Sequence, residues 1–95
     1  MEADKVAAAV AAELDVPVEY IFSGGRKRSA RYARAMFLHV CLALSPGMTH
    51  EELAALLGVH RTSASRAIRK IDAYCTIYSV DRQLANRLRS ALEGA

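Results

Sequence analysis

Residues 49–71 read THEELAALLGVHRTSASRAIRKI, and this stretch decides the expected fold. Thr49 is followed three residues later by Glu52, which is the spacing of a capping box. In that motif each of the two side chains accepts a hydrogen bond from a backbone N–H at the start of a helix. Gly58 can adopt the positive φ that a sharp turn between two helices requires. The stretch therefore predicts a short helix, a glycine turn and a second helix.

The second of these helices has two chemically different faces. Small or apolar side chains recur at helical spacing and form the expected inner face: Ala64, Ala67, Ile68 and Ile71. Basic and polar side chains, nearly all hydrogen-bond donors, form the expected outer face: His60, Arg61, Thr62, Ser65, Arg66 and Arg69. Three apolar residues are expected to anchor the turn: Leu53, Leu57 and Val59. Such a pair of helices is typical of a helix-turn-helix.

Length and composition indicate one small all-α domain that spans residues 1–95. The chain is 53% hydrophobic and only 6% aromatic, and alanine is prominent. These features favour helices over sheet. A chain of 95 residues can bury one small core and has no room for a second fold of any size. We expect a compact bundle of five to six helices that contains the helix-turn-helix.

Apolar spacing places the remaining helices. Residues 1–14 are expected to form the first helix, and residues 18–22 a short apolar turn after it. From Ala33 to Leu44 apolar residues recur at i, i+3, i+4, i+7, i+8 and i+11, which predicts the amphipathic helix at the centre of the core. Apolar residues four apart predict a final helix: Val80, Leu84, Leu88 and Leu92. The segment Ser23–Gly25 is expected to be a flexible joint.

Positive charge is unevenly distributed along the chain. The formal net charge is only +3, yet two windows without Asp or Glu, residues 20–50 and 53–71, hold nine of the 13 Lys and Arg residues. Five of these lie between Arg26 and Arg34, where a loop is expected to lead into a helix. Positive side chains at a helix start oppose the helix dipole, so that an anionic partner is favoured there. A solvated basic loop is the alternative interpretation.

The sequence carries no pattern that predicts catalysis, a metal or a membrane span. His39 and His50 have no companion at metal-ligand spacing, and no Ser or Cys has a base and a carboxylate at a recognisable spacing. Residues 23–29 lack the spacing of a phosphate loop. We expect no enzyme activity, no metal, no cofactor and no small-molecule substrate. Two cysteines on apolar helix faces and the lack of a long apolar run favour a cytoplasmic protein with no membrane contact.

Taken in order, these pieces resemble the DNA-binding carboxyl-terminal domain of DnaA-type replication initiators, a helix-turn-helix variant of the Trp-repressor-like class. The resemblance spans nearly the whole chain and rests on residues 6–22, on the basic residues 26–34 with the helix that follows, and on residues 58–71. The family pattern Gly-x-Arg-Asp-His-Thr-Thr is matched here by Thr62 and Ser63, whereas its Arg-Asp-His trio is replaced. The same stretch is similar to recognition helices of ordinary repressors.

The resemblance implies two groups of residues that contact double-stranded DNA. The first begins the recognition helix and reads bases in the major groove, and it falls at Val59, His60, Arg61 and Thr62, with Ser63 following. The second is an arginine of the basic loop that reaches the minor groove, and it falls among Arg26, Lys27, Arg28 and Arg31. Nothing of an initiator's ATPase module is present in these residues, so that the resemblance implies a standalone, nucleoid-associated DNA binder.

The residues themselves suggest how the contacts divide. Arg61 can present two donors to a guanine, with Thr62 and Ser65 supplying adaptable hydroxyl groups. Arg66 and Arg69 are expected to meet phosphates, and His60 either meets a phosphate or packs in the turn. The tyrosines at positions 20, 32, 74 and 78 could instead stack on single-stranded bases. At helical spacing beside aliphatic residues, however, the last two are expected to lie at the edge of the core.

The expected function is sequence-preferring binding of double-stranded DNA in the control of transcription or replication initiation. The protein would act alone, as a homodimer or with another regulatory protein. The alternative is a protein-interaction module in which the helix-turn-helix is a scaffold and its basic faces dock an acidic partner.

Overall fold

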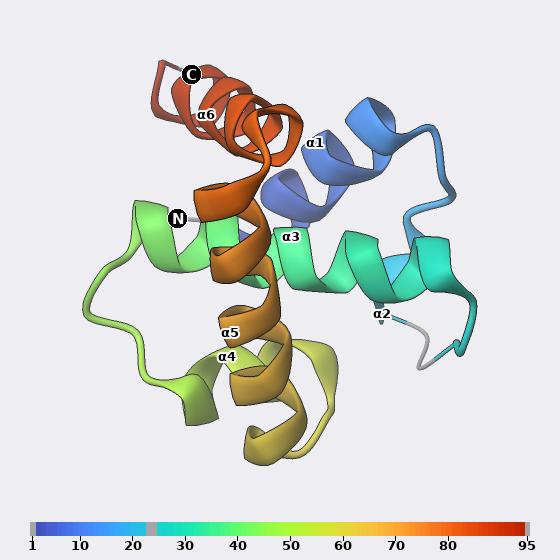
Figure 1. The fold of residues 1–95 in the computed structure, drawn as a ribbon. Helices are drawn as coiled ribbons and strands as arrows, with labels where there is room; N and C mark the ends of the chain where they lie inside the picture. Colours follow the sequence, from blue (N-terminus) through green and yellow to red (C-terminus); the bar gives the residue numbers. More distant parts are fainter. Residues whose placement is uncertain (1, 23–24, 95) are drawn as a thin grey trace.

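The computed structural model describes residues 2–22 and 25–94, and these form six α-helices around one core (Figure 1). In chain order the helices are α1 (Ala3–Leu14), α2 (Glu19–Phe22), α3 (Arg28–Leu44), α4 (His50–Leu57), α5 (Arg61–Ile77) and α6 (Ser79–Glu93). No strand occurs in this described part of the chain. The predicted all-α class and the number of helices are therefore confirmed. Ser23 and Gly24 of the expected joint lie outside the described residues.

Helix α3 lies at the centre of the bundle, and each of the other helices contacts it (Figure 1). Its predicted apolar stripe is buried, with Met36, Phe37 and Val40 completely inaccessible to solvent. The helix starts at Arg28, five residues before the apolar pattern begins at Ala33. The first turn is helical because Ala30 extends the buried face by one more position. The basic residues from Arg28 onward are therefore helical rather than part of a loop.

The α4–α5 unit, residues 49–77, forms as the sequence predicts. The Glu52 backbone N–H donates to the Thr49 hydroxyl at 3.1 Å, and the Thr49 backbone N–H donates to the Glu52 carboxylate at 3.0 Å. These two bonds make up the capping box at the start of α4. Gly58 ends α4 with φ 66° and ψ 33°, which is the left-handed conformation. A local signal thus sets both ends of this short helix.

Helix α6 closes the bundle against α1, α3 and α5. Leu84 and Leu88 are buried as their spacing predicts, whereas Val80 of the same series is 75% exposed. Val80 lies in the first turn of α6, beside the junction with α5, where Ile77 and Tyr78 are also exposed. This junction extends past the edge of the core, so that helical spacing alone overestimates how far the buried stripe reaches. Among the helices of residues 2–22 and 25–94, none has the length and apolarity needed to cross a bilayer.

Candidate nucleic-acid interface

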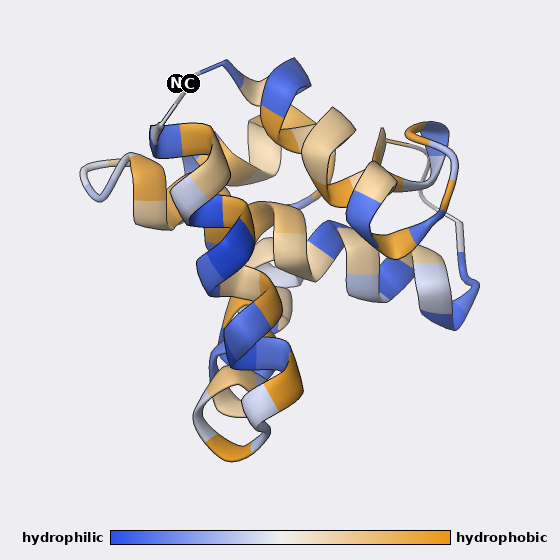
Figure 2. Ribbon diagram, turned by 90° about the horizontal axis from the view of Figure 1, so that it is seen from above, coloured by the Kyte–Doolittle hydropathy of each residue, from blue (hydrophilic) through white to orange (hydrophobic). Residues whose placement is uncertain are grey.

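The two faces of α5 are separated as the spacing predicts. The buried side chains are Ala64, Ile68 and Ile71, with Ala67 partly buried. The exposed side chains are His60, Arg61, Thr62, Ser63, Arg66 and Arg69, with Ser65 partly buried. The packing of the inner face against α3 and α4 leaves a row of cations and hydroxyl groups facing solvent. Figure 2 shows hydrophilic residues along α5, where the α4–α5 unit projects from the rest of the molecule.

His60 caps the start of α5. Its ring Nδ1 accepts a hydrogen bond from the backbone N–H of Thr62 at 3.1 Å. The sequence suggested a phosphate contact or packing in the turn for this residue. Capping was not among those alternatives, because Ser, Thr, Asp and Asn are the residues that usually cap a helix start.

A hollow of about 670 Å³ opens between the start of α4 and the outer face of α5. It is lined by Thr49, His50, Glu51, Arg61, Thr62, Ser65 and Arg69. Two of these side chains are guanidinium groups, three carry hydroxyl groups and one is a carboxylate. The arrangement suits an anionic ligand that accepts several hydrogen bonds.

His50 and Ser65 join the two walls of this hollow. The imidazole Nδ1 of His50 lies 2.7 Å from the hydroxyl oxygen of Ser65. The sequence showed His50 as an isolated histidine, and its partner lies 15 residues further along the chain. Only the crossing of α4 and α5 brings the two side chains together, so that no spacing rule could have revealed the contact.

The basic segment at the start of α3, residues 26–34, contains both free and engaged cations. Arg26, Lys27, Arg28 and Arg31 are exposed. The Lys27 ammonium nonetheless donates to the Tyr20 hydroxyl at 3.4 Å and lies 5.7 Å from the centre of that ring. This lysine therefore rests on α2 and is only partly available to a ligand.

Arg34 of the same segment has a structural role. Its guanidinium donates to the backbone carbonyl of Tyr20 at 3.1 Å and to that of Gly25 at 2.6 Å. Burial, together with the positive charge of Arg31, lowers the pKa of Arg34. The residue ties the segment before α3 to α2, and it belongs to the packing of this end of the molecule.

Tyr32, one of the tyrosines that could stack on bases, is also engaged within the fold. Its hydroxyl donates to the carboxylate of Asp81 in the first turn of α6. Burial and then this hydrogen bond raise the pKa of Tyr32. Of the two tyrosines expected at the edge of the core, Tyr74 is partly buried, whereas Tyr78 is 54% exposed and meets Tyr74 edge to face. Tyr32 thus links α3 to α6, and its hydroxyl proton is used within the fold.

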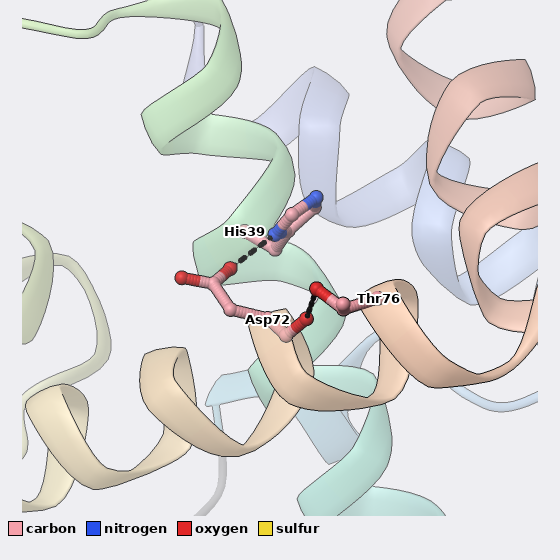
Figure 3. Close-up of polar contacts among 3 residues, drawn as sticks. All are labelled: His39, Asp72 and Thr76. Atoms are coloured by element: carbon pink, nitrogen blue, oxygen red, sulfur yellow. Dashed lines mark hydrogen bonds and ion pairs between the residues drawn. The ribbon is translucent and has the colours of Figure 1, made fainter.

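A second histidine fixes α5 against α3 (Figure 3). The Nδ1 atom of His39 lies 2.9 Å from a carboxylate oxygen of Asp72, and the hydroxyl of Thr76 donates to the backbone carbonyl of Asp72 at 2.9 Å. His39 and Asp72 are 33 residues apart in the sequence, where His39 has no companion at metal-ligand spacing. The pair joins α3 to the second half of α5.

The two predicted groups of DNA-binding residues lie at different margins of the molecule. In Figure 1 the start of α5 lies at the lower edge, beside α4, and the start of α3 lies at the right-hand edge. Helix α5 crosses α3, so that one packed pair of helices carries both groups.

No protein-family model matches this chain, and a search of curated proteins also finds no match. The resemblance to DnaA-type domains therefore stays a prediction from the sequence.

Proposed function

We propose that this protein binds double-stranded DNA with sequence preference and so regulates transcription or replication initiation. The observation that carries the proposal is the outer face of α5, where Arg61, Thr62 and Arg66 are all exposed on one helix. A B-DNA major groove admits an α-helix, and its base edges present the acceptors that such side chains contact. This is the interface that the resemblance to DnaA-type domains implies.

The contacts would divide along α5. Arg61 and Thr62, in the first turn, would meet base edges, while Arg66 and Arg69 would meet phosphates. The helix has 17 residues, which correspond to about 26 Å, and it packs against α3, α4 and α6. The exposed cations before and in the first turn of α3 would contact the same duplex at its backbone or minor groove.

A second candidate is a protein-interaction module whose basic faces dock an acidic partner. The observation that favours it is the exposed apolar cluster at the α5–α6 junction, where Ile77 and Val80 are 67% and 75% exposed and Tyr78 lies between them. Exposed apolar side chains that lie together mark protein contacts more often than DNA contacts. The cationic surface alone is compatible with either partner.

Enrichment of a random duplex library on the protein, followed by sequencing, tests the first proposal. A recovered site would then be titrated by fluorescence anisotropy at several salt concentrations. For DNA binding, log K should fall with log salt with a slope of about −0.9 for each phosphate neutralised. No enrichment, together with negligible affinity for any duplex at physiological salt, would overturn DNA binding in favour of the interaction module.

A matched pair of variants locates the contact. Arg61→Ala removes one exposed arginine from the proposed interface, and Arg89→Ala removes one from the exposed side of α6. Both variants lose the same charge. Arg61→Ala should weaken binding to the recovered site, and Arg89→Ala should leave it unchanged, because α6 lies at the other end of α5 from Arg61 (Figure 1). Equal losses of affinity in the two variants would show that the DNA is bound through the net charge of the protein and not through the outer face of α5.

A further inference from the structure

The hollow between α4 and α5 contains a titratable group that the DNA contacts proposed above do not use. His50 is the first residue of α4, and its imidazole reaches across to Ser65 of α5 at 2.7 Å. Arg61 and Arg69 line the same hollow from the side of α5. One phosphate placed there would face the Arg69 guanidinium, which is assigned to a phosphate above, together with the Ser65 hydroxyl and the His50 imidazole. Arg61 keeps its base contact and adds positive charge to the hollow.

Charged groups of both signs surround His50. On α4, Glu51 lines the hollow, and Glu52 is engaged with Thr49 in the capping box. On α5 the charged groups are Arg61 and Arg69. The last turn of α3, residues 41–44, contains no charged residue. Among the side chains that line the hollow, two guanidinium groups face one carboxylate before the imidazole is counted, and the ionised Glu52 adds a second negative charge outside the lining.

We propose that this hollow seats one phosphate of the nucleic-acid backbone and that His50 takes up a proton when the phosphate binds. The inference rests on the proposed function and adds one phosphate contact and its chemistry to it. A lone helix start would offer only backbone N–H groups. Here side chains from two helices, already joined by a hydrogen bond, surround the position that the phosphate would occupy.

The hydrogen bond between His50 and Ser65 explains why a proton would matter. A neutral imidazole can accept the Ser65 hydroxyl proton at Nδ1, which uses the only proton that this hydroxyl can donate. In a protonated imidazole both nitrogens are donors, so that Nδ1–H must donate to the hydroxyl oxygen. Ser65 is then free to donate its own proton to a phosphate oxygen. Starting from the tautomer that accepts at Nδ1, protonation therefore adds one positive charge and one hydrogen-bond donor to the hollow; from the other tautomer it adds the charge alone.

The direction of the pH dependence follows from this exchange. Histidine side chains change charge between about pH 5 and pH 8, whereas a phosphodiester stays anionic throughout that range. A bound phosphate favours the protonated imidazole, so that binding and protonation stabilise each other. Duplex affinity should increase as the pH falls through this range and decrease as the pH rises through it.

Binding of the recovered duplex between pH 6 and pH 8 at constant ionic strength tests the inference. The wild-type affinity should increase toward pH 6 by up to about tenfold per pH unit, which is the limit for uptake of one proton. His50→Gln should remove most of this dependence, and Ser65→Ala should reduce it. His39→Gln is the control for the pH dependence alone: the partner of His39, Asp72, does not line the hollow, so that this variant should keep the full pH dependence even if the loss of the contact with α5 lowers its affinity. A wild-type affinity without pH dependence, or a His50→Gln protein that keeps all of it, would overturn the inference.

A titration with inorganic phosphate, followed by NMR at fixed pH, separates this inference from the proposed function. Phosphate should shift the amide signals of His50 and Glu51 and the ring signals of His50, and Glu51→Gln should tighten binding by removing a repulsive charge. If the protein binds no duplex but phosphate shifts these signals, the phosphate site in the hollow is supported and the proposed function fails. If a duplex binds and these signals do not move with either the duplex or inorganic phosphate, the phosphate site is rejected and the proposed function stands.

Discussion

The basic segment at the start of α3 and the first half of α5 look alike in sequence and differ in what the fold does with their charge. At the start of α3, Arg34 donates to two backbone carbonyls and Lys27 rests on the Tyr20 ring. On α5, Arg61 and Arg66 are exposed and make no hydrogen bond or ion pair with the residues that the structure describes. Charge density along a sequence therefore does not show which cations are available to a ligand. Backbone carbonyls of α2 and of the segment before α3 engage one of them, Arg34.

The largest effect should come from Arg34→Ala, which removes a guanidinium from two carbonyls in a partly buried position. Hydrogen bonds to charged groups contribute about 1.5 to 3 kcal/mol, so that the free energy of unfolding should fall by about 2 to 3 kcal/mol. Urea denaturation measures this loss. The control is Arg31→Ala, an exposed arginine one turn earlier, which should change stability by less than about 0.5 kcal/mol. Similar losses of stability for the two variants would show that the hydrogen bonds of Arg34 to the two carbonyls do not stabilise the fold.

Arg61→Ala should have the opposite profile, with folding unchanged and DNA binding weakened. Binding to the preferred duplex should lose about 1 to 3 kcal/mol, and discrimination at one base pair should relax. Arg28→Ala, which removes an exposed cation in the first turn of α3, should weaken binding to preferred and random duplexes alike, because a phosphate contact carries no sequence information. Anisotropy titrations on both duplexes measure the difference. Equal losses on the two duplexes for both variants would reject this division between base and phosphate contacts.

Gly58→Ala tests the turn that presents α5. Gly58 has φ 66°, and a Cβ atom at this position would meet nothing within 4 Å. The penalty is therefore conformational, and about 1 to 2 kcal/mol of stability should be lost. Gly47 precedes α4, also has open space for a Cβ atom and lacks a positive φ. Gly47→Ala should therefore be neutral or slightly stabilising in thermal denaturation. A neutral Gly58→Ala protein would show that the turn can adopt another conformation.

Local signals explain how much of the fold could be predicted. The Thr49–Glu52 capping box and Gly58 act within four residues of the backbone that they organise, and both were found where the sequence placed them. The α3 stripe was predicted from Ala33 because apolar spacing is its only signal. The first turn, from Arg28, carries mainly charged and polar residues, and Ala30 was the single cue that the buried face extended further.

The candidate site was predictable as a surface, whereas its internal contacts were not. Helical spacing alone separates the exposed Arg61 and Arg66 from the buried Ile68, because one period describes both faces. The partners of His39 and His50 lie 33 and 15 residues away in the sequence. Their contacts depend on how helices cross, which is set by the packing of the whole core. The hydrogen bonds of Arg34 to the carbonyls of Tyr20 and Gly25 likewise depend on the path of the chain between α2 and α3, which helical spacing does not predict.

The smallest effect concerns the caps at the helix starts of the two compared regions, the α4–α5 unit and α3. Side chains of Thr49 and His60 cap α4 and α5, whereas α3 has no side-chain cap at its start. Thr49→Ala should lower the free energy of unfolding by about 1 kcal/mol. Amide exchange should increase in α4 and remain unchanged in the first turn of α3.

The cap should also give the stability of α4 a dependence on pH. The hydrogen bonds that Glu52 shares with Thr49 lower the pKa of Glu52 in the folded protein. A carboxyl group with a lowered pKa stabilises the fold above its unfolded pKa, and this stabilisation is lost as the pH falls through the folded pKa. Glu52→Gln should therefore differ from wild type near neutral pH and converge with it in acid, which urea denaturation across the pH range would measure. A constant difference at every pH would show that Glu52 acts through packing rather than through its charge.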